Sequence, residues 1–169
     1  MRLQGAGISL DLPRGWEGRV RPRGPEPLEG SGSASAVRAQ SAGPMPVVVQ
    51  AANFALPTTL GDFGGGAVEA MTARDLFVTL FEYGPESAGT ALFERQGMPR
   101  VLRPADLDPW SLRTPLPGMS GAQVFFTEAG RPFCLYVAVG SHLRRFRTLP
   151  VISSVLQSVQ IADVLGPRP

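Results

Sequence analysis

The side chains best suited to chemistry in this sequence are its one histidine, its one cysteine and a closely spaced pair of aspartates. His142 follows an apolar run, and a single histidine supplies neither a histidine-rich metal site nor a catalytic triad on its own. Cys134 lies between Phe133 and Leu135, whereas a reactive thiol needs partial exposure and a positive neighbour. We expect His142 in a surface loop and Cys134 in the core.

Asp106 and Asp108 could place two carboxylates on one side of a strand, the arrangement that metal sites and glycosidases use. They lie between Pro104 and Pro109, where aspartate also forms turns and caps helices. No further acidic residue clusters with them in the sequence. We therefore expect a structural role for both.

Three consecutive glycines at 64–66 precede a short apolar segment, as in a loop that holds phosphate at a helix start. The segment lacks the Lys-Ser/Thr pair of a P-loop and the spaced glycines of a dinucleotide-binding motif. Asp62-Phe63-Gly64 matches a kinase tripeptide, but the other kinase motifs are missing from the sequence. No catalytic set emerges, so we expect a protein that is not an enzyme, with no cofactor and no bound metal.

The remaining candidate function is the binding of a partner, which two arginine clusters and two tryptophans indicate. One cluster alternates along a strand near the N-terminus, and the other surrounds Phe146. These charges suit an acidic protein surface or phosphates, and a solvated face explains them equally well. Tryptophans in proline-containing turns are either interface anchors or caps of the core. The candidate partner-binding residues are Arg19, Arg21, Arg23, Arg144, Arg145, Arg147, Trp16 and Trp110.

The composition narrows the class of protein. All 16 basic residues are arginine, a bias typical of a GC-rich genome, and the formal net charge is only +2, so nucleic-acid binding is not expected. A single cysteine excludes an intramolecular disulfide. No stretch approaches the roughly 20 apolar residues of a membrane-spanning helix, and the first residues lack the apolar region of a signal peptide. The expected location is the cytoplasm.

Alternating and β-branched apolar residues predict four strands in the first half of the chain. The first two, at 7–12 and 18–23, flank a Pro-Arg-Gly-Trp turn and are expected to form an opening hairpin. The next two cover 46–56 and 75–83. Between and after them we expect a helical turn at 67–71, a helix starting at 84–86 with Ala88, Ala91 and Leu92 facing inward, and an ordered proline-rich loop with short strands at 98–118.

The clearest local pattern is a hairpin over 122–139 with a two-residue turn at Ala129-Gly130. Its register pairs Glu128 with Arg131, Phe126 with Phe133 and Val124 with Leu135. Both faces of the hairpin are largely apolar, which predicts that other elements cover the sheet on each side.

The last part of the chain predicts a helix that Thr148 caps and that has Pro150 in its first turn. Residues 159–161 either continue this helix or form a short last strand after it. Apolar residues that recur at helical spacing form the inward face of the helix, namely Ile152, Val155, Leu156 and Val159.

A length of 169 residues fits a single folded unit. We expect one α+β domain over residues 1–162, with a mobile Pro/Gly/Ser-rich excursion at 24–46 and a C-terminal tail at 163–169.

An opening strand at 7–13 is followed by Arg14-Gly15-Trp16-Glu17, and the chain closes with a helix and strand over 153–161. These two ends resemble PsbP-like proteins, which begin with a strand, Leu-Pro and x-Gly-Trp. That fold occurs in the photosystem subunit PsbP, in a nuclear-import factor that binds Ran, and in many small bacterial proteins. The resemblance implies an antiparallel sheet flanked by helices, an α/β/α sandwich, and a docking role without a shared catalytic residue.

The function expected from the sequence is a non-enzymatic protein-binding or assembly module, an accessory or structural subunit of a larger complex. Its partners would be other protein subunits, and the sequence leaves its oligomeric state open. The alternative is a small-molecule-binding domain or an enzyme with a pocket between the sheet and its helices.

Overall fold

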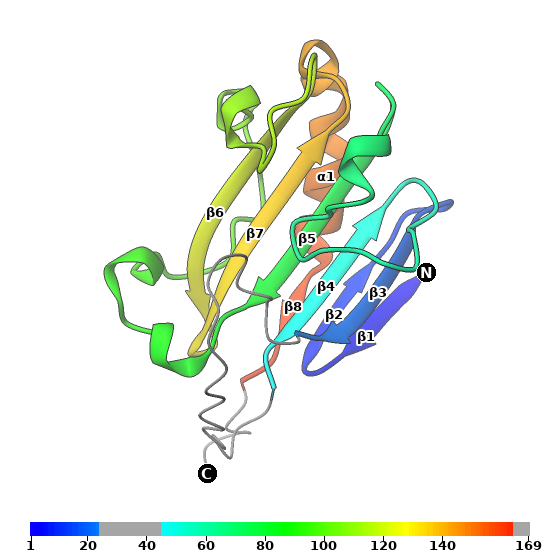
Figure 1. Cartoon of the computed structure of the whole chain (residues 1–169). Coiled ribbons are helices and arrows are strands. Elements are labelled where there is room, and N and C mark those ends of the chain that lie inside the picture. Colours follow the sequence, from blue (N-terminus) through cyan, green and yellow to red (C-terminus); the bar gives the residue numbers. More distant parts are fainter. Residues whose placement is uncertain (24–44, 164–169) are drawn as a thin grey trace, which may run out of the picture.

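Two antiparallel sheets and one α-helix make up the computed structural model, which describes residues 1–23 and 45–163 (Figure 1). The larger sheet has five strands in the order β3-β4-β5-β7-β6. Its strands are β3 (Glu17–Pro22), β4 (Val47–Ala52), β5 (Leu76–Glu82), β6 (Ser120–Glu128) and β7 (Arg131–Val139). All neighbouring pairs are antiparallel, so the mixed α+β class expected from the sequence is confirmed.

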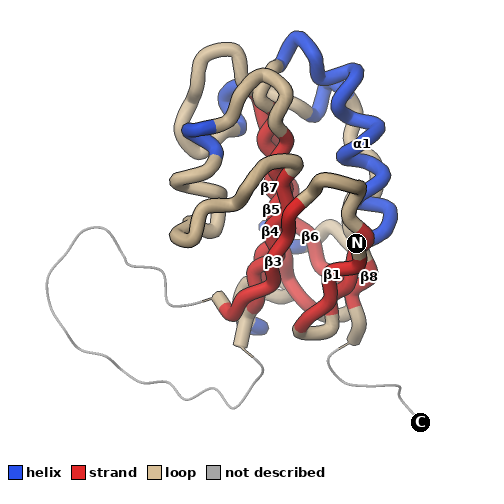
Figure 2. The backbone as a smooth tube through the Cα atoms, turned by 90° about the vertical axis from the view of Figure 1, so that its right-hand side faces the viewer, coloured by secondary structure: helices blue, strands red, loops and turns tan. Residues whose placement is uncertain are grey.

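The smaller sheet has the order β1-β2-β8 and joins the two ends of the described chain. Its strands are β1 (Arg2–Gly5), β2 (Ile8–Asp11) and β8 (Gln160–Ile161). The one α-helix, α1 (Arg145–Ser158), lies with this small sheet on one side of the larger sheet, and loops cover the other side (Figure 2). The predicted cover on both faces of the hairpin is therefore confirmed, with an α-helix on one of them.

Two apolar cores lie against the two faces of the five-stranded sheet. On the α1 side, sheet residues such as Phe133 and Leu135 pack with Ile152 and Leu156 of the helix. On the loop side, Phe77, Phe81 and Tyr136 pack with residues of the loops, among them Phe63 and Leu112. Strand residues alternate between the faces, so β5 and β7, which are central and mostly apolar, are buried on both sides.

The predicted hairpin over 122–139 is confirmed in its register. β6 and β7 pair Glu128 with Arg131, Phe126 with Phe133 and Val124 with Leu135. Ala129 and Gly130 both have positive φ, 53° and 70°, which is the backbone that a two-residue hairpin turn requires. The strand at 75–83 and the short strand after the helix are likewise present, as β5 and β8.

The predicted opening hairpin is wrong, because β2 and β3 belong to different sheets. β1, which the sequence pattern did not reveal, takes one edge of β2, and β4 takes the edge of β3. The turn between them therefore carries the chain from one sheet to the other. The two sheets approach closely there, since a Cβ on Gly18 would lie 2.6 Å from the Cδ1 atom of Leu12.

The helix predicted to start at 84–86 is also wrong. Two 3-10 turns stand in its place, η2 (Pro85–Ser87) and η3 (Ala91–Phe93), separated by Gly89 with φ of +80°. Leu92 is 56% exposed and Phe93 fills the core instead. The helical turn predicted at 67–71 is confirmed as the 3-10 turn η1 (Val68–Ala70).

Loop residues 98–118 are ordered, as predicted, but contain 3-10 turns rather than strands. These are η4 (Pro104–Asp106) and η5 (Pro109–Ser111), and one isolated bridge pairs Asp108 with Gly121. Most of the excursion predicted at 24–46 and the tail predicted at 163–169 lie outside the described residues.

The predicted cap of the last helix is wrong by one turn. A 3-10 turn, η6 (His142–Arg144), leads into α1, which begins at Arg145. The Thr148 hydroxyl lies inside the helix and donates to the Arg145 carbonyl oxygen at 3.2 Å, and Pro150 lies inside the helix as well. The inward face is confirmed, since the predicted residues are buried, namely Ile152, Val155, Leu156 and Val159.

A buried ion pair lies within the larger sheet, and its arginine also contacts the smaller sheet. Arg131 at the start of β7 is 6% exposed and its Nε donates to Glu82 Oε1 at 2.8 Å, while Nη2 donates to Glu82 Oε2 at 2.9 Å. Nη2 also donates to the carbonyl oxygen of Ala6, in the β1–β2 turn, at 3.2 Å. One guanidinium therefore contacts both sheets at once.

Candidate docking surface

The predicted partner-binding residues lie in different parts of the molecule. β3 carries Arg19 and Arg21, and Arg23 follows its last residue; we call these three the β3 arginines. Arg144, Arg145 and Arg147 lie at the start of α1. In Figure 1, β7 ends and α1 begins at the upper end of the larger sheet. β3 runs in the opposite direction to β7, from the upper end to the lower end, so Arg23, which follows β3, lies near the lower end. The two arginine clusters therefore do not form one patch.

The β3 arginines contact a loop segment of the same chain. Arg19 donates to the Leu56 carbonyl oxygen at 3.1 Å. Arg21 and Arg23 both bind the carboxylate of Asp62, at 2.5 and 2.9 Å. These bonds hold residues 56–62 against the sheet, so the three guanidinium groups already have anionic or carbonyl partners within the protein.

A buried side chain and an aromatic ring complete the attachment of this loop. The Gln50 amide donates to the Gly61 carbonyl oxygen at 2.7 Å. The Phe63 ring packs edge-on against Phe81 and Tyr136, with centroids 4.7 and 5.3 Å apart. The β3 arginines thus serve in covering the loop-side core.

The two tryptophans differ in exposure. Trp16 is buried in the core on the α1 side, so its indole caps the core and does not present an anchor. Trp110 lies on η5 and is 80% exposed, which keeps it available as a contact residue.

An exposed apolar stripe follows η6 and the first turns of α1. Leu143 is 88% exposed and Phe146 is 63% exposed, and Pro150 and Val151 are exposed further along the helix. Positions three, four and seven apart lie on one face of a helix. The stripe is therefore continuous and points away from the core, whereas the outer face of a surface helix is normally polar.

Arginines flank this stripe. Arg144 and Arg147 are exposed, and the half-buried Arg145 donates to the His142 carbonyl oxygen at 2.8 Å and lies 4.9 Å from the Phe146 ring centroid. We call this region the α1 docking surface. It consists of Leu143, Arg144, Phe146, Arg147, Pro150 and Val151.

The sequence reasoning found the arginines of this surface but missed its apolar residues. It placed the helix start at Thr148, so Leu143 and Phe146 were not seen as part of a helical stripe. The signal was present in the spacing of Leu143, Phe146 and Pro150, once the first turn is moved to Arg145.

The residues considered for catalysis have structural roles. His142 was predicted in a surface loop, but it is half-buried at the start of the 3-10 turn η6, where its backbone N–H donates to the Gly118 carbonyl oxygen at 2.7 Å. Asp106 accepts from the Arg103 backbone N–H at 2.7 Å at the start of η4, and the Arg103 guanidinium, which donates to Asp106 Oδ1 at 3.1 Å, lowers the pKa of the carboxyl group. Asp108 accepts from the Trp110 N–H at 2.7 Å at the start of η5. The predicted turn and cap roles of the aspartates are therefore confirmed.

Cys134 is fully buried, and burial raises the pKa of its thiol to about 12, against an ordinary value of 9.0. We expect no reaction with Ellman's reagent at mildly alkaline pH in the folded protein, and full reaction after denaturation. Because the unfolded chain loses the proton first, the free energy of unfolding should fall as pH rises from about 9 toward 12. Cys134→Ala should lack this component of the pH dependence, and rapid native labelling would contradict the prediction.

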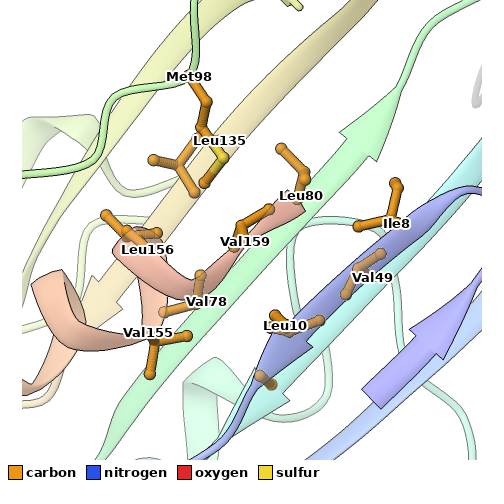
Figure 3. A pocket seen from close by; sticks show the side chains of 11 residues that line it. Ile8, Leu10, Val49, Val78, Leu80, Met98, Leu135, Val155, Leu156 and Val159 are labelled. Carbon is orange, nitrogen blue, oxygen red and sulfur yellow. The ribbon is translucent and has the colours of Figure 1, made fainter. Parts of the chain in front are cut away.

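A small cavity lies between the larger sheet and the α1 layer (Figure 3). Its volume is about 10 Å³, and its lining is apolar, with Leu10, Leu80, Leu135, Val155 and Leu156 among the lining residues. A cavity of this size has room for about one water molecule. It is a packing defect of the core on the scale of a methyl group.

The described residues hold no cluster of three or more His, Cys, Asp and Glu side chains that could bind a metal ion. Within residues 1–23 and 45–163, no helix is long and apolar enough to cross a membrane. Comparison of the chain with protein-family models, curated proteins and solved structures finds no match. The evidence for a function is therefore the geometry and charge of the α1 docking surface itself.

Proposed function

We propose that this chain is a non-enzymatic protein-binding module, an accessory subunit of a larger assembly, and that it docks its partner on the α1 docking surface. The observation that carries the proposal is the exposed apolar stripe of Leu143 and Phe146 flanked by Arg144 and Arg147. A buried aromatic or aliphatic centre with arginine at its margin is typical of binding hot spots.

The stripe has no structural task in the isolated chain. α1 already buries its inward face against the sheet through Ile152, Val155 and Leu156. Exposing Leu143 and Phe146 to water gains no packing energy, and burying each against a partner would contribute about 1.5–3 kcal/mol of hydrophobic free energy. Leu143 and Phe146 would therefore stabilise a complex with a partner, not the isolated chain.

The finer fold belongs to the same proposal. We assign the chain a PsbP-like architecture because β2 pairs with β8, which brings together the two stretches that carry the resemblance. A loop layer with 3-10 turns stands where the sandwich would have its second helical layer. A docking role is the function that this resemblance implies.

Exchanging Leu143 and Phe146 together for serine should remove the partner. In an affinity pull-down of the tagged full chain from its native cells, we expect stoichiometric proteins to be retained by the unaltered chain and lost by this variant. The matched control is Leu92→Ser with Val101→Ser, which removes two exposed apolar side chains elsewhere and should retain the same proteins. Equal retention by the two variants, or no retained protein at all, would contradict the proposal.

The alternative proposal is a small-molecule site between the larger sheet and the helix, and the cavity described there is small. The cavity between sheet and helix holds about 10 Å³ and is lined by apolar side chains. A drug-sized ligand needs a pocket of about 300–1,000 Å³. Stabilisation of the folded chain by cell metabolites in a thermal-shift screen would favour this alternative over docking.

A further inference from the structure

We infer that the partner segment seated on the α1 docking surface is acidic and amphipathic, with apolar side chains over Leu143 and Phe146 and carboxylates toward Arg144 and Arg147. This inference rests on the proposed function and adds the chemistry of the partner. Four arguments support it: the local charge, the start of the helix, the poorer fit of other occupants and the length of the stripe.

The charged side chains of η6 and α1 themselves are all positive. No Asp or Glu occurs between Glu128 and Asp163, so η6 and α1 carry arginine as their only permanently charged side chains. The neighbouring acidic side chain on the adjoining turn, Asp75, accepts from the Thr72 N–H at 2.6 Å and is thereby engaged. Arg144 and Arg147 therefore face solvent with no carboxylate from their own elements.

The start of α1 makes this arrangement unfavourable in the free protein. The first turn of α1 contains no acidic residue, although the N-terminus of a helix carries a partial positive charge of about half an elementary charge. Three arginines, Arg144, Arg145 and Arg147, add positive charge at that position. Acidic side chains of a partner would reduce both the repulsion among the arginines and the positive charge at the helix end. A helix start that carries basic instead of acidic residues departs from the usual pattern, and such departures mark functional sites.

Other occupants fit less well. A second copy of the chain would bring the arginines of two such surfaces together, and like charges across an interface oppose association. A lipid surface attracts clusters of 4–8 basic residues, at about 1 kcal/mol for each. This surface presents two exposed arginines, so electrostatics would hold it to a membrane only weakly.

The dimensions suit a short helical or extended segment. From Leu143 to Val151 the stripe rises by roughly 12 Å, at 1.5 Å per residue, which is about two turns of a partner helix. The occupant is therefore a segment with one or two apolar anchors between acidic residues.

The test uses a phage library of random peptides of about 16 residues, long enough for roughly four helical turns. The library is selected on the folded full chain and counter-selected on the Leu143→Ser, Phe146→Ser variant. We expect the recovered peptides to be enriched in Asp and Glu together with aromatic or aliphatic residues. Fluorescence anisotropy with a labelled synthetic peptide should give a Kd that rises roughly tenfold in Arg144→Gln with Arg147→Gln, and that rises with added salt.

The control removes two arginines that are exposed elsewhere. Arg14→Gln with Arg95→Gln changes the net charge by the same amount and should leave the Kd within about twofold. All variants should keep the melting temperature of the unaltered chain, since none of the exchanged side chains is buried.

The outcomes separate this inference from the proposed function. Peptides that need Leu143 and Phe146 but carry no excess of acidic residues would overturn the acidic partner and leave docking intact. A library in which no peptide distinguishes the two chains would overturn both. Binding to phosphatidylglycerol vesicles but not to phosphatidylcholine vesicles would identify a lipid surface instead, if the Leu143/Phe146 variant and the Arg144/Arg147 variant both lose it. A dimer in sedimentation that needs Phe146 would identify a second copy.

Discussion

Replacing Arg131 by methionine is expected to lower the free energy of unfolding by about 3–5 kcal/mol, the range for breaking a buried ion pair by removing one partner. The variant leaves the Glu82 carboxylate buried without the guanidinium that binds both of its oxygens. It also removes the bond to the Ala6 carbonyl oxygen, which ties the larger sheet to the smaller one. Urea denaturation measured by circular dichroism gives the change.

The control for this prediction replaces both partners. Arg131→Met with Glu82→Leu removes the uncompensated charge, and substitution of a whole buried pair by apolar residues is often close to neutral. We therefore expect the double variant to be more stable than Arg131→Met alone. A single variant that loses less than about 1 kcal/mol, the value of a surface ion pair, would show that water reaches this pair.

Replacing Gly140 by alanine should cost about 3 kcal/mol, at the upper end of what overpacking a core costs. A Cβ on Gly140 would overlap the backbone carbonyl of Thr72, and the same junction is held by the Gly140 N–H bonded to the Asp75 carbonyl oxygen at 2.9 Å. Backbone cannot rotate away as a side chain can, so the two segments must separate. Because Gly140 joins β7 to η6, the α1 docking surface should also shift.

Gly65 offers a matched control in a loop. A Cβ there would have no neighbour within 4 Å, and Gly65 has no positive φ. Gly65→Ala should therefore leave stability unchanged or raise it by a few tenths to about 1 kcal/mol, because alanine restricts the unfolded chain. If both glycine variants unfold at the same urea concentration, the close contact at Gly140 does not constrain the fold.

The sequence was most informative where structure is local. The β6–β7 hairpin could be read because its turn residues, its apolar alternation and its cross-strand pairs all lie within 122–139. The strand β5 and the inward face of α1 were similarly clear, since each is set by a period that one short segment displays.

Pairing between distant segments could not be read in the same way. The local sequence is compatible with a hairpin of β2 and β3. In the structure, β1 and β8 occupy the two edges of β2 instead, so β3 pairs elsewhere. The helix expected after residue 84 failed for a different reason, because Gly89 with φ of +80° ends the first turn and the loop packs Phe93 into the core.

The candidate site was half visible. Arg144 and Arg147 stood out by charge, and Trp110 by its proline-containing turn, and all three are exposed. Trp16 and the β3 arginines met the same criteria but contact their own chain. Trp16 packs in the core, whereas the arginines bind Asp62 and the Leu56 carbonyl oxygen. Residue type alone cannot separate these cases, because exposure depends on which loop the fold lays over each side chain.

The pairing of β2 with β8 also constrains how the molecule is made. Ile8 pairs with Ile161, and the Ala162 N–H donates to the Gly7 carbonyl oxygen at 2.8 Å. Contacts between residues so far apart form late and slow folding, because the intervening chain must be closed first. During synthesis, the edge of β2 that pairs with β8 therefore stays unpaired until almost all of the described chain has left the ribosome. A chain that ends before residue 160 lacks β8, so that edge of β2 stays unpaired and the small sheet closes only after α1 has been made.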